Sequence, residues 1–434
     1  MKTGTTVADE DTLERVLPPY LGRQRWYAGA APDRVEVAAR EALCEGMEWM
    51  LVDAGGARYQ VVLGAREAGS APEFLSGNDV AVLGVSEGCL LFDAVLDPAY
   101  AKALLERVVP GEAVDRVRPM GAEQSNSSLV FDDRLVLKLF RRLNDGPNPD
   151  IEVTTALTER GFTHVARPLG VWREDGLDLA VCTEYLAGGA EGWALALTSL
   201  RDLYATGVDD PAGTGGDFAA EAGRLGAVTA ELHLAMAESF GTAPGDAAAW
   251  AGAVADQLTR LDPGDVGPEA AAVFVERLRA VEDPGRQIRV HGDYHLGQVM
   301  RTDAGWFVLD FEGEPARPVE QRRLPSSPLK DVAGMLRSFQ YAAAVALSER
   351  DRADQDRLGH VGEAWEHRNR KAFLRGYLGT EGIGALLPPE GDSRDAVLAA
   401  FELDKAVYEV LYERAHRPEW VEIPLSHVRR LLDA

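Results

Sequence analysis

The sequence predicts an α+β fold in which a strand-rich N-terminal part precedes a mainly helical C-terminal part. Within residues 1–100, one helix-like segment is followed by five short strand-like runs that glycine-containing turns separate. This pattern is typical of a small antiparallel sheet packed on a helix. From residue 188 onwards, apolar residues recur mostly at helical spacing. Three parts are therefore expected, with boundaries at 1–100, 101–187 and 188–434.

Each element has its own signal in the chain. In the first part, apolar residues at helical spacing predict a helix over 11–20. The five strands are expected over 34–39, 48–53, 59–63, 81–85 and 89–93. A helix over 97–108 opens the second part, and helices over 219–239, 354–382 and 395–416 dominate the third. His233, on the first of these three, is expected to be a packed core histidine.

One lysine lies inside an apolar strand-like run, 135–140, although the chain has only six lysines. Alternation along that strand points Lys138 to the face opposite Leu137 and Leu139. Because a buried ammonium is unfavourable unless it meets an anion, Lys138 needs acidic partners. Glu152, in the helix-like segment 149–160, is expected to supply one, and the phosphates of a nucleotide supply the other.

A polar loop comes directly before the lysine strand. It reads EQSNSS over 123–128 and offers small side chains, hydroxyls and backbone amides, as in the turn of a β-hairpin. An ordinary polar turn would look the same, and the loop is no Walker A motif. Its position before the lysine strand favours a phosphate-binding role for Gln124, Ser125, Asn126, Ser127 and Ser128.

The segment 290–315, VHGDYHLGQVMRTDAGWFVLDFEGEP, carries the strongest chemical signal. Asp293 is followed five residues later by Gln298, and a strand-like run ends at Asp310. Phosphoryl transfer to an alcohol needs a carboxylate for the hydroxyl proton, and an amide oxygen and a second carboxylate for Mg²⁺. The catalytic loop H-R-D-x-x-x-x-N of protein kinases uses the same interval, with Asn in place of Gln. A turn whose carboxylates bind backbone amides is the alternative, which the matching distances disfavour.

The segment 183–186 is expected to form the hinge between two lobes, where backbone groups of residues such as Glu184 and Tyr185 bind adenine. The flexible turn 187–190 follows it. The order of polar loop, strand lysine, helix glutamate, hinge, HGD…Q and DFE is that of a kinase on a bilobal fold, with ATP as the phosphoryl donor.

With HGDYHLGQV (291–299) and DFEGEP (310–315), the chain resembles the aminoglycoside-phosphotransferase branch of the kinase-like fold, and within it the maltokinases. The stretches 22–30, 123–131, 327–339 and 402–425 extend the resemblance over nearly the whole chain. The resemblance implies a bilobal protein-kinase-like fold, with 1–100 as an antiparallel β-sheet cap domain, 101–187 as the kinase N-lobe and 188–434 as a helical C-lobe. It also implies ATP-dependent phosphorylation of maltose to maltose 1-phosphate, with Mg²⁺, feeding α-glucan synthesis from trehalose.

Residue by residue, the resemblance gives Asp293 as the catalytic base, Gln298 and Asp310 as metal ligands, and Lys138 with 124–128 as the phosphate site. The helix 402–416 gathers Asp404, Lys405, Tyr408, Glu409 and Tyr412 on one face. Such a face could equally be an amphipathic surface with (i, i+4) pairs. The resemblance favours maltose contacts, which we assign to His295, Glu312, Lys405, Tyr408 and Glu409.

Composition narrows the class of partner. The net charge of −25 disfavours nucleic acid and anionic membranes, and the nucleotide therefore needs a local cationic pocket with Mg²⁺. No apolar run approaches the ~20 residues that span a bilayer. The three cysteines are far apart and show neither a disulfide framework nor a zinc motif. We expect a cytoplasmic monomer that binds maltose, with trehalose synthase, the enzyme that would supply maltose, as a candidate partner.

Two other functions stay open. A glucosamine kinase or another small-molecule kinase of the aminoglycoside type would share the cap and core, but an altered DFEGEP segment would be expected there. A catalytically silent nucleotide-binding protein would not need Lys138, Glu152, Asp293, Gln298 and Asp310 together.

The segment GRQRWYAGA (22–30) is expected to pack the cap on the kinase core near the phosphate loop. In this interpretation Trp26 and Tyr27 are buried at the junction, and Arg23 and Arg25 pair with carboxylates. Core aromatics wholly internal to the cap are the alternative.

Overall fold

The structure is a computed structural model that describes residues 6–27, 29–69, 72–121, 126–206, 208–314 and 317–433. Its chain divides into two compact units. The N-terminal unit comprises residues 1–155 and 166–187, and the C-terminal unit comprises 156–165 and 188–434. Residue 100 lies inside the N-terminal unit, residue 188 begins the second segment of the C-terminal unit, and the three predicted domains stay a prediction.

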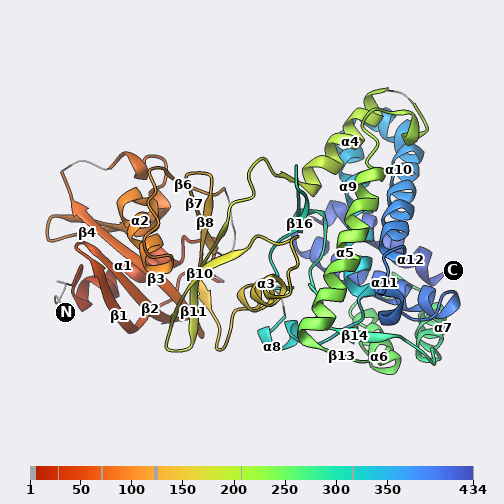
Figure 1. Cartoon of the computed structure of the whole chain (residues 1–434), viewed down its shortest axis with the longest axis horizontal. Helices are drawn as coiled ribbons and strands as arrows, with labels where there is room; N and C mark the ends of the chain where they lie inside the picture. The colour runs from red at the N-terminus through yellow and green to blue at the C-terminus, as the bar shows by residue number, and fades with distance from the viewer. Residues whose placement is uncertain are drawn as a thin grey trace. The chain divides into compact units, whose positions relative to one another are not determined.

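The N-terminal unit begins with a helix and an antiparallel sheet (Figure 1). Asp9 caps the helix by accepting a hydrogen bond from the Thr12 amide at 2.9 Å. The sheet order is β1-β2-β3-β5-β4, and the short strand β9 also pairs with β3. The predicted helix and five strands are confirmed, with β1 and β3 longer than expected. Their bounds are α1 (Glu10–Leu21), β1 (Glu36–Cys44), β2 (Met47–Ala54), β3 (Ala57–Glu67), β4 (Val82–Ser86), β5 (Cys89–Asp93) and β9 (Arg142–Leu143).

A second antiparallel sheet of the same unit has the order β10-β11-β8-β7-β6. Its β6–β7 pairing confirms the hairpin expected before the lysine strand. Asp132 and Asp133, both at positive φ, form the tight turn that joins β7 to β8. The elements are α2 (Pro98–Val108), β6 (Val117–Pro119), β7 (Asn126–Phe131), β8 (Leu135–Phe140), α3 (Pro149–Glu159), β10 (Pro168–Glu174) and β11 (Leu177–Glu184).

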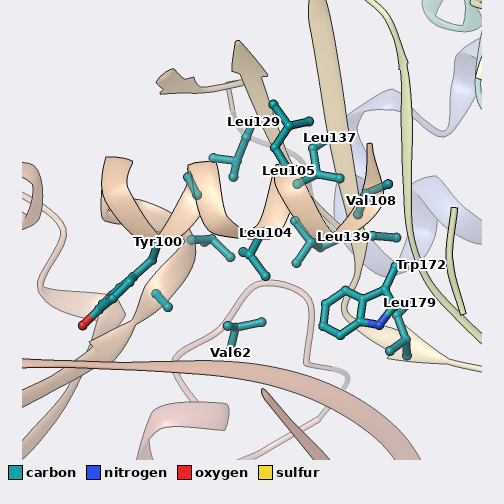
Figure 2. Packing of buried hydrophobic residues seen from close by; sticks show 14 of the residues in the cluster. Val62, Tyr100, Leu104, Leu105, Val108, Leu129, Leu137, Leu139, Trp172 and Leu179 are labelled. Atoms are coloured by element: carbon teal, nitrogen blue, oxygen red, sulfur yellow. The ribbon is translucent and has the colours of Figure 1, made fainter. Parts of the chain in front are cut away.

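One hydrophobic core joins the two sheets through helix α2. Figure 2 shows Leu104 and Leu105 of α2 among Val62 of β3 and Leu137 of β8, all of them buried. The fully buried amide of Gln60 in β3 donates to the carbonyl of Phe140 at 2.7 Å, and also to that of Leu179 in β11. Since buried amides need such partners, the first sheet is anchored on the second.

Trp26 and Tyr27 pack in the core of the cap itself, as in the alternative interpretation, and Trp26 is only partly buried. Trp26 contacts the rings of Tyr20 and Tyr59, and the guanidinium of Arg141, which follows β8, lies 5.2 Å from the Trp26 ring. Tyr27 is buried against Tyr59.

The expectation that the arginines of this segment pair with carboxylates is wrong for Arg23. Its guanidinium donates to the carbonyl of Val82 at 2.6 Å, because it lies beside the edge strand β4. Arg25 is exposed to solvent.

The C-terminal unit is mainly helical. Figure 1 shows α5, α9 and α10 running along one another. α5 and α10 approach so closely that a Cβ atom on Gly376 would lie 1.9 Å from the carbonyl oxygen of Gly223. The helices are α4 (Gly192–Thr206), α5 (Ala219–Phe240), α6 (Ala247–Leu258), α7 (Pro268–Arg279), α8 (Val319–Arg322), α9 (Leu329–Ser348), α10 (Arg352–Leu378), α11 (Asp392–His416) and α12 (Glu422–Leu432). None of the described helices is both long and apolar enough to span a bilayer.

Two small sheets complete the C-terminal unit. The three-stranded sheet has the order β12-β15-β16 and flanks the HGD segment on its C-terminal side. Strand β13 pairs with β14, which precedes that segment. The strands are β12 (Ala190–Glu191), β13 (Thr242–Pro244), β14 (Arg286–Ile288), β15 (Val299–Thr302) and β16 (Gly305–Val308). The loop with Asp293 is therefore held between short strands at both of its ends.

Candidate active site

A buried hydrogen-bond network fixes the loop that carries Asp293. The fully buried carboxylate of Asp331, on α9, accepts from the amides of His291 and Gly292 at 2.8 and 2.9 Å. Gly292 has φ of +88°, a conformation that favours glycine. His233, as predicted a packed core histidine, links Asp331 at 3.2 Å to the hydroxyl of Tyr377 at 2.8 Å. Burial acts to raise the pKa of Asp331, but the bond to His233 and the amide bonds outweigh it and lower that pKa.

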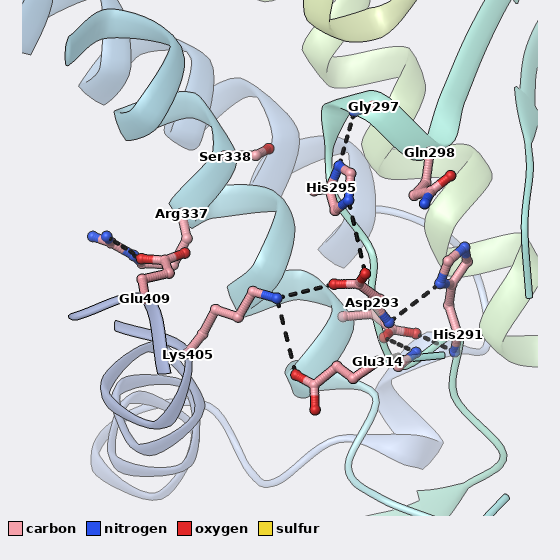
Figure 3. A network of polar contacts seen from close by, with 12 residues as sticks. His291, Asp293, His295, Gly297, Gln298, Glu314, Arg337, Ser338, Lys405 and Glu409 are labelled. Atoms are coloured by element: carbon pink, nitrogen blue, oxygen red, sulfur yellow. Dashed lines mark hydrogen bonds and ion pairs between the residues drawn. The ribbon is translucent and has the colours of Figure 1, made fainter. Parts of the chain in front are cut away.

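Asp293 lies between two cationic or hydrogen-bonding side chains (Figure 3). Its Oδ1 accepts from Nζ of Lys405 at 3.0 Å, and its Oδ2 lies 4.0 Å from Nε2 of His295. The amide of Gly297 donates to Nδ1 of His295, so the neutral ring carries its proton on Nε2. Burial alone would raise the pKa of Asp293, but Lys405 and the nearby histidines lower it to about 2. Asp293 is therefore ionised, with Oδ2 left for an acceptor hydroxyl.

The two predicted metal ligands, Gln298 and Asp310, contact each other. Nε2 of Gln298 donates to Oδ2 of Asp310 at 3.2 Å. Asp310 has φ of +61°, a strained conformation of the kind that clusters at functional sites. The carboxylate of Glu312 approaches that of Asp310 within 4.8 Å. Carboxylate and amide oxygens suit Mg²⁺, so these residues fit such an ion. Glu312, predicted as a sugar contact, lies beside the predicted metal ligands.

Helix α11 carries three of the predicted sugar residues and brings Lys405 to Asp293, the predicted base. Besides Asp293, Nζ of Lys405 faces Oε1 of Glu314 at 3.9 Å, and it lies 5.2 Å from the ring centre of Tyr408. Glu409 is held by the buried guanidinium of Arg337 on α9, with distances of 2.5 and 3.0 Å. The bond of Glu409 to Arg337 therefore fastens α11 to α9, while Lys405 contacts the carboxylate of Asp293.

In the N-terminal unit, Lys138 of β8 points away from its buried neighbours Leu137 and Leu139, as alternation predicts. Its Nζ pairs with Oδ2 of Asp150 at 3.1 Å, and both side chains are largely buried. The sequence analysis named Glu152, on the same helix α3, as this carboxylate, and the role of Glu152 stays a prediction.

The predicted phosphate loop is described only in part. Gln124 and Ser125 lie outside the described residues, while Asn126, Ser127 and Ser128 open strand β7. Arg141 Nε donates to the hydroxyl oxygen of Ser127 at 2.8 Å. This end of the loop is therefore anchored to Arg141, which a chain of buried contacts joins to the cap.

Two backbone amides of the predicted hinge have acceptors within the N-terminal unit. The amide of Glu184 donates to the carbonyl of Arg167 at 3.1 Å, and that of Tyr185 donates to the carbonyl of Arg134 at 2.8 Å. These two amides already have acceptors in the fold, because the chain pairs with neighbouring segments as it leaves β11. Adenine contacts through the other backbone groups of this segment stay a prediction.

Three functional residues escaped the sequence analysis. Asp331 lies within the stretch 327–339, but only packing shows its two amide bonds, across about 40 residues of sequence. Glu314 lies in DFEGEP two residues after Glu312, and Asp150 lies two residues before Glu152. In both segments the acidic composition indicated that a functional carboxylate is present. It did not indicate which of the neighbouring carboxylates makes the contact.

Comparison with family models gives two matches. Residues 116–342 match the phosphotransferase enzyme family, and residues 20–97 match the maltokinase N-terminal cap domain. The first range holds Lys138, Asp293 and Asp310. The second covers α1 in part and strands β1 to β5 of the first sheet.

Curated and solved relatives point to sugar kinases. The chain is 30% identical over 344 residues to a glucosamine kinase of Mycolicibacterium smegmatis, covering 73% of this chain and 79% of that protein. It is 29% identical to a glucosamine kinase of Streptacidiphilus jiangxiensis, with 75% of each chain covered. A solved glucosamine kinase in complex with glucosamine, ADP and inorganic phosphate aligns over 97% of this chain and 98% of that one, with a TM-score of 0.69 and 24% identity. The last comparison shows the shared fold.

Proposed function

Because the chain belongs to the phosphotransferase enzyme family, we propose that it transfers the γ-phosphoryl group of ATP to the anomeric hydroxyl of maltose, giving maltose 1-phosphate. The observation that supports this class of reaction is the ionised Asp293. Lys405 donates to its Oδ1, and its Oδ2 is available to an acceptor hydroxyl. The observation that favours maltose is the match of residues 20–97 to the maltokinase N-terminal cap domain.

In this proposal Asp293 orients the acceptor hydroxyl. A carboxylate with a pKa of about 2 is a weak base, so it holds the hydroxyl by a hydrogen bond. It takes the proton as the new oxygen–phosphorus bond forms and the bond between the γ-phosphorus and the leaving ADP breaks. Lys405 keeps Oδ1 occupied, which directs Oδ2 at the hydroxyl. His295, with its proton on Nε2, can donate to an oxygen of the same sugar.

The donor side uses the other predicted residues. Lys138, fixed by Asp150, offers a positive charge to the phosphates, and the start of β7 follows the predicted phosphate loop. Gln298, Asp310 and Glu312 would hold Mg²⁺, which neutralises phosphate charge when bound. Since binding of ATP to a chain of net charge −25 is unfavourable at long range, these local cations matter more than the overall field.

Glucosamine is the second candidate acceptor. The named relatives at 30% and 29% identity are glucosamine kinases, and the chain covers at least three quarters of each. An aminoglycoside is a third acceptor of the same family type. We further propose a cytoplasmic monomer, with trehalose synthase as the enzyme that would supply maltose.

The test is an ATP-consumption assay of the purified chain with maltose, glucosamine and an aminoglycoside, each with Mg²⁺. The expected result is turnover with maltose and a product whose phosphate is attached to the anomeric carbon by ³¹P NMR. Faster turnover with glucosamine would replace maltose by the second candidate. Nucleotide binding without consumption on any acceptor would instead indicate a silent kinase-like protein. Asp293→Asn serves as the inactive control.

A further inference from the structure

Two carboxylates of the candidate acceptor site face a single ammonium group. Nζ of Lys405 lies 3.0 Å from Oδ1 of Asp293 and 3.9 Å from Oε1 of Glu314, and the three side chains converge in Figure 3. The Lys405 side chain is 18% exposed, so its charge is largely removed from water and depends on these partners. The two carboxylates thus form a binding place for an ammonium ion, and a side chain of the protein fills it.

The charges around Lys405 are nearly balanced. Glu314 is also paired with Arg317, and Glu409 with Arg337. Asp404, next to Lys405 on α11, lies 3.9 Å from Arg317, and burial raises its pKa. The groups that face this place from all the packed elements are Asp293 and His295 of the catalytic loop, Glu314 and Arg317 near α8, Lys330 and Arg337 of α9, and Asp404, Lys405, Tyr408 and Glu409 of α11.

We propose that Lys405 determines the class of acceptor: its ammonium occupies the place where the amino group of a cationic sugar would bind, so the site selects neutral sugars. This inference rests on the proposed phosphorylation of a sugar hydroxyl at Asp293. An amino sugar brought to the open Oδ2 of Asp293 would carry a second positive charge close to Lys405. Such like-charge juxtaposition is strongly unfavourable in a site of low dielectric.

Removing the lysine reverses the selection. Without Lys405, Asp293 and Glu314 lose their shared cation and attract one from solution. The amino group of glucosamine supplies such a cation on a sugar, whereas maltose supplies none. The variant without Lys405 is therefore expected to shift its preference from neutral sugars to amino sugars. Its rate with maltose is expected to fall, because Lys405 no longer holds the carboxylate of Asp293 in position.

The experiment measures kcat/KM for maltose and for glucosamine and takes the ratio of the two. In Lys405→Met the ratio of maltose to glucosamine is expected to fall by about tenfold or more, since like-charge repulsion has been removed. Lys405→Arg keeps the charge and is expected to keep a ratio that favours maltose. Lys371→Met is the control: it removes the charge of an exposed lysine of α10 that is not among the groups facing Lys405, and it is expected to change the ratio by less than about twofold.

A second measurement on the unaltered protein does not depend on a variant that folds. Between about pH 6.5 and about pH 9 a sugar amine of ordinary α-amino basicity loses its charge. Burial lowers the pKa of Lys405, but Asp293 and Glu314 outweigh it and raise that pKa, so the lysine stays charged over this range. The discrimination against glucosamine is therefore expected to weaken as pH rises. A protein group whose titration changes kcat/KM equally for maltose and for glucosamine does not change the ratio of the two values.

The outcomes separate the two proposals. A ratio that Lys405→Met leaves unchanged, or that does not vary with pH in the unaltered protein, overturns the role of Lys405 even if maltose is phosphorylated. If maltose is not a substrate but another neutral sugar is, the ratio is measured with that sugar. The inference is then supported by the same changes while the choice of maltose fails.

Discussion

The buried guanidinium of Arg141 joins the cap to the start of the predicted phosphate strand, and Arg141→Met is expected to destabilise the N-terminal unit. Arg141 donates to Oδ2 of Asp93 at 2.6 Å and to the hydroxyl of Ser127 at 2.8 Å. Asp93 also accepts from the hydroxyl of Tyr20 in α1 at 2.7 Å. The side chains of Arg141 and Asp93 are 1% and 6% exposed, so water cannot replace either partner.

The size of the effect follows from this burial. Methionine in place of Arg141 leaves the Asp93 carboxylate buried without its cation, and breaking a buried pair on one side is expected to lower the free energy of unfolding by about 3–5 kcal/mol. Replacing both partners, as in Arg141→Met with Asp93→Leu, removes the stranded charge and is expected to recover part of the loss. Tyr20→Phe deletes one hydrogen bond to a charged group, for about 1.5–3 kcal/mol.

The assay is urea unfolding of the full chain, combined with hydrogen exchange of peptides from α1, from β7 and from α9. Arg141→Met is expected to reduce protection in α1 and β7 together, to leave α9 protected, and to raise the KM for ATP through Ser127. Tyr27→Phe is the matched control for Tyr20→Phe, because Tyr27 is also buried against Tyr59 but makes no hydrogen bond to Asp93. Unchanged stability in Arg141→Met, or a double variant that loses the sum of the single losses, would refute the coupling.

Three further predictions concern the C-terminal unit. Asp293→Asn is expected to lower turnover by about 10²–10⁴-fold while binding of a fluorescent ATP analogue stays nearly intact, and a rate above about a tenth of the original would argue against Asp293 as base. Asp310→Asn is expected to raise the Mg²⁺ concentration needed for half-maximal activity. If that concentration does not change, the role of metal ligand passes to Glu312, and Glu312→Gln must raise it instead. The pKa of Asp293 is lowered to about 2, so its charge and its contribution to stability are present above the ordinary carboxyl pKa and disappear only as pH falls through about 2. The kcat/KM profile of the unaltered protein therefore should show no loss from Asp293 between about pH 5 and pH 8, whereas Lys405→Met, which leaves a buried carboxylate without its cation, should gain an acid limb in that range.

The sequence by itself determined the order and local geometry of the kinase elements. Alternation in 135–140 predicted the orientation of Lys138, and short-range patterns predicted the helix and five strands of the first sheet and the helices α5, α10 and α11 of the C-terminal unit. The interval between Asp293 and Gln298, with Asp310 at the end of a strand, predicted that an amide and two carboxylates belong to one site. These inferences hold because residues within one loop and its flanking strands have few ways to arrange themselves.

The partners of the buried charges were decided by the tertiary structure. Lys405 reaches Asp293 across 112 residues of sequence, and Asp331 reaches the catalytic loop across about 40. Asp150 meets Lys138 at 3.1 Å, and the sequence did not single out this carboxylate, since the rotation of α3 against β8 depends on packing along its whole length. Several acidic residues near each cation have the right chemistry, and only the packing of distant elements selects one of them, because a buried charge is stable only where its counter-charge lies within a few ångström.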